Sequence, residues 1–228
     1  MTTTTRPGPR ERLLEAAREL TYTHGVHVGV DAILGRADVA RRSLYQHFGG
    51  KDGLIAEMLR TQATADRYRE TMDAAGDDPR ERVLAVFDEL ERVTTRPTFR
   101  GCRYTAAELA LSDPDHPAHA EVRAHKEELH RIFAAELTRY GHPDPEFGAD
   151  QILVLVDGVL AHAVTRPGAH PALAARAMAE TILGPGATEK PGGTEKPGGT
   201  EKPGGTEKPG GTEKPGGTEK PGATPERG

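Results

Sequence analysis

The sequence predicts an all-α fold of about nine helices followed by a C-terminal repeat that does not fold. Apolar residues recur at spacings of three and four along most of residues 9–183, which is the period of a helix. No segment shows the alternating β-branched pattern of a strand. Proline, glycine and aspartate fall at the edges of the apolar stretches, where helices begin and end.

Three short helices are expected near the N-terminus. The first begins at Pro9 and stops near Gly25, because proline suits a first turn and glycine ends a helix. The second covers residues 30–37 and the third residues 41–48. Asp38 is expected to form the tight turn between these two, since aspartate tolerates the left-handed conformation better than most residues.

The remaining helices form a larger body. Asp78 followed by Pro79 is a helix start, and Pro97 ends that helix. The body helices are expected at residues 51–75, 79–96, 104–111, 117–140, 144–165 and 171–183. The chain is thus divided into a disordered N-terminal arm, a three-helix domain, the helical body and a disordered tail, at residues 1–8, 9–50, 51–186 and 187–228.

The helix at residues 144–165 is apolar over more than one stripe, so it needs burial on two sides. One side can face the body. The other side most economically faces a second copy of the chain, beside the alanine-rich last helix. The residues expected at this homodimer interface are Leu153, Val156, Leu160, Ala163, Ala175 and Met178.

The tail contains six copies of TEKPGG, the last ending in PGA. Each copy lacks apolar residues and carries proline and glycine, so the tail is expected to be disordered. TEKP resembles a zinc-finger linker, but no Cys/His pairs lie between the copies. A solvating tail and a binding segment both remain open.

Composition limits the possible classes of protein. The net charge is −5, yet residues 1–60 carry nine basic against seven acidic residues while residues 61–187 carry fourteen against twenty-one. A phosphate-binding surface would therefore be local to the N-terminal part. With a single cysteine, no hydrophobic leader and no run approaching the ~18 apolar residues that cross a bilayer, we expect a cytoplasmic protein away from the membrane.

Residues 30–54 have the outline of a helix-turn-helix. Leu44 and Phe48 point inward one turn apart, which leaves the other side of the third helix to face outward. A short helix offered to the major groove reads bases with residues near its N-terminus, and arginine can bind guanine bidentately. The residues expected at DNA are Arg41, Arg42, Ser43, Tyr45, Gln46, His47 and Lys51. A solvated surface remains an alternative for the arginine pair, as does packing for Tyr45 and His47.

The same stretch resembles the TetR family of bacterial transcriptional regulators. The resemblance rests on matched positions at the family's spacing, namely Gly25, Ile33, Ala37, Val39, Ser43-Leu44-Tyr45, His47-Phe48, Lys51 and Leu54. It covers residues 9–60 well, and the rest agrees in helix number and in the apolar penultimate helix. It implies that Tyr45, His47 and Lys51 touch the DNA backbone.

The resemblance further implies a homodimer that binds palindromic double-stranded DNA, an inverted-repeat operator, as a repressor. An unknown small-molecule effector bound in the body would release it. Two copies would place their recognition helices about 34 Å apart, in successive major grooves.

Three positions depart from the family pattern. Ala40 and Gly29 stand where capping side chains are usual, and Ala40 costs the helix about 1 kcal/mol relative to serine. Asp38 stands where glycine is usual and places a negative charge near the expected DNA. These departures motivate the alternative of a protein-interaction adaptor that kept the fold and lost specific DNA binding.

The effector pocket is less well marked. Polar residues within the body helices that could line it are Cys102, Tyr104, Glu108, His125, Asp157 and His162. A dimer-interface or capping contact is an equally good explanation for Asp157 and His162. With 4% aromatic residues and no tryptophan, an aliphatic or small polar effector is favoured over a large flat one.

No metal or other cofactor is expected. His116, His119 and His125 have a spacing that could converge on an ion, but surface histidines at a helix start explain them as well. Cys102 could be a redox sensor or a plain thiol. An enzyme is disfavoured, because the sequence lacks a nucleophile elbow, an HExxH run and a phosphate-binding glycine loop.

Overall fold

The computed structural model describes residues 6–184, in which all regular structure is helical. This confirms the all-α prediction. The ten helices within these residues are α1 (Pro9–His24), α2 (Val30–Ala37), α3 (Arg41–Phe48), α4 (Lys51–Arg60), α5 (Thr64–Ala74), α6 (Pro79–Thr94), α7 (Arg103–Ala110), α8 (Ala118–Tyr140), α9 (Pro145–Thr165) and α10 (Pro171–Leu183). The expected disorder of the tail at residues 187–228 concerns residues outside those described.

The expected boundary residues start and stop these helices. Asp78 caps α6 by accepting a hydrogen bond from the Arg80 backbone N–H at 2.9 Å. Asp144 caps α9 in the same way, from Phe147 N–H at 3.1 Å. Asp38 adopts the predicted left-handed conformation, with φ of 51°, and so turns the chain from α2 into α3.

The prediction of a single long helix at residues 51–75 is wrong, because this segment forms two helices, α4 and α5. The Thr61 hydroxyl donates back to the Glu57 carbonyl at 2.8 Å, a bond that competes with helix continuation. Arg18 of α1 also donates to the Thr61 hydroxyl, at 2.8 Å. This contact comes from the folded domain, so helical periodicity gave no sign of the break.

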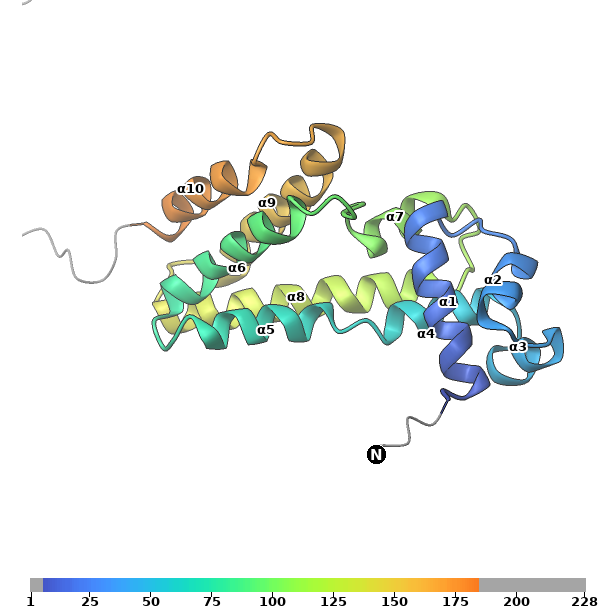
Figure 1. Cartoon of the computed structure of the whole chain (residues 1–228). Coiled ribbons are helices and arrows are strands. Elements are labelled where there is room, and N and C mark those ends of the chain that lie inside the picture. Colours follow the sequence, from blue (N-terminus) through green and yellow to red (C-terminus); the bar gives the residue numbers. More distant parts are fainter. Residues whose placement is uncertain (1–5, 185–228) are drawn as a thin grey trace, which may run out of the picture. The chain divides into compact units, whose positions relative to one another are not determined.

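One hydrophobic core lies among α1, α2, α3 and α4 (Figure 1). Its largest side chains include Leu13, Ile33, Leu44 and Leu54, each no more than 1% exposed. Residues of α7 and the first turns of α8 complete this core. The N-terminal helices are therefore fixed to the rest of the protein through α7 and α8.

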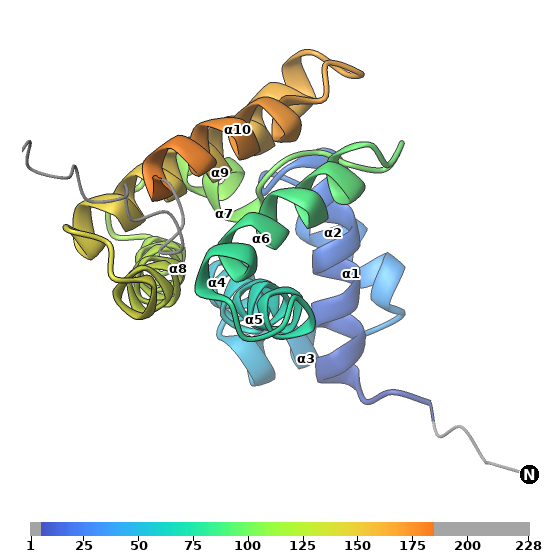
Figure 2. The same ribbon diagram turned by 90° about the vertical axis from the view of Figure 1, so that its left-hand side faces the viewer.

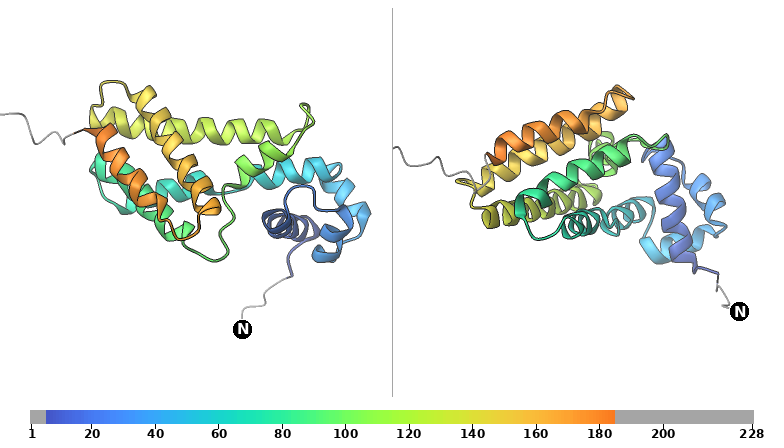
Figure 3. Two further views of the ribbon diagram at one scale, coloured as in Figure 1. Left: turned by 90° about the horizontal axis from the view of Figure 1, so that it is seen from above. Right: turned by 60° about the vertical axis from the view of Figure 1, so that its left-hand side comes forward.

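A second core fills the body, among α5, α6, α8, α9 and α10. Figure 2 looks along α5 and α8, with α6, α9 and α10 crossing them, and Figure 3 shows α10 beside α9. Phe87 and Phe133 are almost completely buried at the centre. Glu136, also buried, accepts hydrogen bonds from Arg82 at 2.9 Å and Arg139 at 2.7 Å, and thus ties α6 to α8.

Among the described helices, α9 is long and apolar enough to cross a membrane on length and composition, with a mean hydropathy of 1.5. This corrects the expectation that no run meets that limit. In the fold, Ile152, Val156 and Val159 of α9 are no more than 2% exposed and lie in the body core. One face of α9 therefore lies in the body core, although only 33% of its most apolar window is buried.

We predict that Gly53→Ala destabilises the protein by about 1–3 kcal/mol, the usual cost of overpacking. A Cβ at Gly53 would lie 2.0 Å from the Phe48 carbonyl oxygen, where the start of α4 passes over the end of α3. Urea unfolding followed by circular dichroism measures the change.

Gly35→Ala is the matched control on α2. A Cβ there meets no atom within 4 Å. This variant should be neutral or gain about 0.5–1 kcal/mol, since alanine favours a helix. Equal loss of stability in both variants would contradict the close approach at Gly53.

Candidate nucleic-acid interface and adjoining cavity

The helix α3 presents one face inward and one outward. Leu44 is 1% exposed in the N-terminal core, and Phe48 packs partly against it. The remaining side chains expected at DNA point away from this core, with Ser43 and Lys51 half-buried and the others exposed, namely Arg41, Arg42, Tyr45, Gln46 and His47. Packing inside the small domain therefore does not explain Tyr45, which is 56% exposed, or His47.

The two adjacent arginines differ in their surroundings. Arg41 is held by Asp31 of α2 at 2.5 Å, and both side chains are more than half exposed. An exposed ion pair is worth only about 0–1 kcal/mol, so a phosphate or base can replace Asp31. The side chain of Arg42 makes no ion pair or hydrogen bond within residues 6–184.

The helix starts next to this surface lack side-chain caps. Ala40 before α3, Gly50 before α4 and Gly29 before α2 make no capping hydrogen bond. The first-turn N–H groups of α4, beside Lys51, are thus left for solvent or an anion, and a helix N-terminus favours phosphate.

The negative charge of Asp38 is offset within the protein. Its carboxylate forms an ion pair with Arg6 and lies 3.4 Å from Arg12. The hydrogen bond from Arg6, with the charges of both arginines, lowers the pKa of Asp38 below its ordinary value. Arg12 also donates to the Asp38 and Ala37 carbonyls, at 2.7 and 2.9 Å. Asp38 is therefore part of a structured turn that Arg12 holds against α1.

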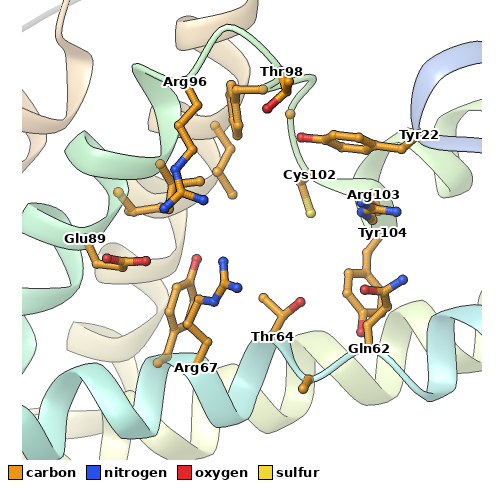
Figure 4. A pocket seen from close by; sticks show the side chains of 17 residues that line it. Tyr22, Gln62, Thr64, Arg67, Glu89, Arg96, Thr98, Cys102, Arg103 and Tyr104 are labelled. Carbon is orange, nitrogen blue, oxygen red and sulfur yellow. The ribbon is translucent and has the colours of Figure 1, made fainter. Parts of the chain in front are cut away.

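A cavity of about 440 Å³ lies between this domain and the body (Figure 4). Tyr22 of α1 forms one wall, the α4–α5 connection and α5 form another, and α6, the α6–α7 loop, the start of α7 and Leu160 of α9 complete the lining. Of the six side chains expected at an effector pocket, Cys102 and Tyr104 line this cavity.

The other four candidates lie outside its lining and mostly have partners. Glu108 binds His119 at 2.8 Å, and Asp157 binds Lys126 at 2.5 Å. His125 stacks on the outer face of Tyr104 with ring centroids 3.6 Å apart. His162 is half-buried on α9. The contacts of Glu108, Asp157 and His125 explain these three residues as structural parts of the body.

The cavity contains polar residues that the sequence did not single out. They include Tyr22, Gln62, Arg67 and Arg96, which come from four separate segments of the chain. Each stands in an ordinary helical or loop context, so only the folded chain brings them together.

The three histidines considered for a metal have other contacts. His119 hydrogen-bonds Glu108 and the Asp113 carbonyl, and the bond to Glu108 is the main cause of its raised pKa. His116 lies 3.4 Å from Asp52 of α4. His125 is stacked on Tyr104. Within the described residues, no three His, Cys, Asp or Glu side chains gather closely enough to hold a metal ion.

The residues expected at a dimer interface divide into two groups. Val156, Ala163 and Ala175 are buried within one chain, and Leu153 and Leu160 are half-buried against the body core, so packing within the chain covers much of their surface and their place at a dimer interface stays a prediction. Met178 is 57% exposed. The apolar side chains that α9 and α10 leave exposed are Phe147, Val154, Val164, Leu173 and Met178.

Comparison with known proteins agrees with this geometry. The family model described as bacterial regulatory proteins, tetR family, matches residues 13–58, which include most of α1, all of α2 and α3, and most of α4. Among solved structures, a tetR transcriptional regulator (sav143) of Streptomyces avermitilis is 36% identical, with a TM-score of 0.63 over 76% of this chain and 99% of its own. The TetR-family regulator SCO4454 of Streptomyces coelicolor is 30% identical, with a TM-score of 0.68 over 77% and 94%.

A third structure shows a related fold on DNA. The TetR-family regulator CifR, a cysteine mutant solved with 26-base-pair operator DNA, is 23% identical with a TM-score of 0.64, over 78% of this chain and 96% of its own. An outward-facing helix after a tight turn, on an all-helical body, is the arrangement of a helix-turn-helix protein, and the matched family is one of bacterial regulators. The chain belongs to the TetR family of bacterial regulators and is a DNA-binding protein of that class.

We predict that His125 makes stability depend on pH. Burial, helped by the charge of Lys126, lowers its pKa to about 4, against about 6.5 in the unfolded chain. The unfolded state therefore binds a proton first, and wild-type stability falls as pH drops from 6.5 toward 4.

His125→Phe keeps a ring against Tyr104 and removes this titration. Urea unfolding at pH 7.5 and 4.5 should show that wild type loses about 2–3 kcal/mol more than the variant. Other titrating groups, including His119, are common to both proteins and cancel. Parallel losses in the two proteins would show that His125 titrates normally.

Proposed function

We propose that this protein is a homodimeric repressor that binds an inverted-repeat operator and is released by a small molecule bound in the cavity. The observation that carries the proposal is the shared wall of that cavity, where Tyr22 of α1 lies beside residues of the body. A ligand there would touch both the DNA-reading domain and the body. Binding can then favour one relative position of the two over another.

Direct contacts join the cavity wall to α1. The guanidinium of Arg103 stacks over the Tyr22 ring at 3.9 Å and donates to the Arg18 carbonyl at 2.7 Å. The Arg100 backbone N–H donates to the Tyr22 hydroxyl at 2.8 Å. A ligand that moves the α6–α7 loop would therefore pull on α1, against which α3 packs.

The exposed apolar side chains of α9 and α10 support a dimer. Val154 is 71% exposed, and Leu173 and Met178 are each more than half exposed. Large apolar side chains gathered on two neighbouring helices favour burial against a partner. The helices α9 and α10 lie side by side. If a second copy placed its own α9 and α10 against them, the four helices would form a symmetric contact.

Two such subunits would present two α3 helices to one duplex. One short helix reads too few base pairs for a genome-scale search, and two related by a twofold axis read an inverted repeat. The alternative of an adaptor without DNA binding rested on the weak caps at Ala40 and Gly29 and on the charge of Asp38. The caps are absent, whereas the pairing of Asp38 with Arg6 and Arg12 weakens the motive from its charge. The proposed function needs no catalysis or cofactor, and its place is the bacterial cytoplasm.

We predict distinct effects of two substitutions on DNA binding. Arg41→Ala should relax sequence preference by about 1–3 kcal/mol at one base pair, the value of a lost bidentate contact. Lys51→Ala should weaken all duplexes alike and lower the salt slope by about 1. Selection of bound duplexes from random DNA, followed by titration at several salt concentrations, measures both.

Arg131→Ala is the matched control, because Arg131 is an exposed arginine on α8 in the body that pairs with Glu128. It should leave affinity and salt slope unchanged. Unaltered DNA binding in both test variants would remove α3 and Lys51 from the interface.

We also predict that Leu173→Glu combined with Met178→Glu produces a folded monomer. Both substitutions place charge on the exposed face of α10, and buried unpaired charge is strongly unfavourable. Analytical ultracentrifugation measures the change. Leu109→Glu on α7, where the side chain is 83% exposed, should remain dimeric. A wild-type monomer at micromolar concentration would overturn the dimer.

A further inference from the structure

We propose that the cavity binds an organic anion, a carboxylate or phosphate head on an apolar body, with Arg67 and Arg96 holding the head. The regulatory consequence rests on the proposed function, whereas the binding site itself does not. The inference follows from the charges that line the cavity.

Arg67 and Arg96 extend into the cavity from opposite walls, α5 and the α6–α7 loop (Figure 4). Within the part of the chain that the structure describes, neither guanidinium makes an ion pair or a hydrogen bond. A guanidinium carries five N–H donors in a planar fork that matches carboxylate and phosphate oxygens. Two such forks directed into one cavity form a site for an anion.

The lining of the cavity offers Arg67 and Arg96 no free carboxylate with which to pair. Its lining contains one carboxylate, Glu89, and both oxygens of Glu89 accept hydrogen bonds from Arg92, at 2.6 and 2.7 Å. Arg103, a third cation in the lining, adds to the positive potential. An incoming anion would relieve the repulsion among these charges and gain charge-assisted hydrogen bonds.

Arginines elsewhere in the protein are commonly paired. Arg60 binds Glu57, Arg69 binds Asp66 and Glu128, and Arg139 binds Glu136. Arg42, Arg123 and Arg166 also make no ion pair or side-chain hydrogen bond within residues 6–184, and Arg67 and Arg96 are themselves exposed to solvent. What distinguishes Arg67 and Arg96 is that both line one cavity, where a single anion can reach the two guanidinium groups.

A further donor in the lining also has no partner. The side-chain Nε2 of Gln62 is buried and makes no hydrogen bond. Buried donors are nearly always satisfied, so an unsatisfied one at a cavity wall indicates an absent acceptor. Gln62 lies in the connection between α4 and α5, and its donor adds a neutral contact to those of the two arginines.

The rest of the lining determines the other end of the ligand. Leu90, Val93, Phe99 and Leu160 contribute apolar surface to the same cavity. A volume of about 440 Å³ falls in the range of small-molecule sites. The complementary ligand has an anionic head and an apolar body, which separates it from sugars and from organic cations.

Isothermal titration calorimetry with four probes of one chain length tests the proposal. The probes are octanoate, octyl phosphate, octanol and octylammonium. At least one of the two anions should bind about tenfold or more tightly than octanol, because hydrogen bonds to charged groups are lost in the alcohol. Octylammonium should bind weakest. The two anions distinguish a carboxylate head from a phosphate head.

Arg67→Met and Arg96→Met should each weaken anion binding about tenfold or more and leave octanol binding unchanged. Arg67→Lys should retain part of the affinity, since it keeps the charge and loses the fork. Arg69→Met is the matched control on the same helix, because Arg69 is paired outside the lining, and it should bind the anions like wild type. Circular dichroism melting confirms that each variant folds.

Octanol binding as tightly as both anions, anion affinity unchanged in Arg67→Met and Arg96→Met, or binding of neither anion would each overturn the proposal. Operator binding measured with and without the anion keeps the two proposals apart. An anion that binds through Arg67 and Arg96 without altering operator affinity supports the site and contradicts its regulatory role. Failure to bind any operator without ligand concerns the proposed function alone.

Discussion

The buried phenol of Tyr104 holds the two groups of helices in one position relative to each other. Its ring stacks on His125 of α8 at 3.6 Å, and its hydroxyl donates to the Leu59 carbonyl of α4 at 3.0 Å. Burial raises its pKa to about 12, so the phenol keeps its donor proton. Because the same ring lines the cavity, the contact that fixes α4 to the body also forms part of the proposed ligand site.

Contacts at the cavity are therefore linked to the orientation of α3. α4 packs beside α3 in the N-terminal core, and α1 is tied to the α6–α7 loop through Tyr22 and Arg103. The N-terminal helices thus meet the cavity at two places, through the end of α4 and through α1. A shift of a few ångströms at either contact would change the spacing of two recognition helices in a dimer, and the grooves of DNA tolerate little misplacement.

The α2–α3 turn and the cavity differ in how their arginines are paired with carboxylates. At the α2–α3 turn, Asp38 is paired with Arg6 and Arg12, and Arg41 is paired with exposed Asp31, so the turn is ordered while Arg42 stays free. In the cavity, the one lining carboxylate is already engaged by Arg92, and the arginines beside it are left without a partner. In the functions proposed here, arginine contacts nucleic acid at the first surface and an anionic ligand at the second.

The sequence by itself determined the helices, the left-handed turn at Asp38 and the outward face of α3, because periodicity, capping and turn preference are local properties. Tertiary structure decided the break after Arg60, through the contact of Arg18 with Thr61, and it placed Val156 and Ala175 in the core. It also gathered Tyr22, Gln62, Arg67 and Arg96 around one cavity. These outcomes depend on residues distant in sequence that meet only after packing, and periodicity carries no information about which distant faces will meet.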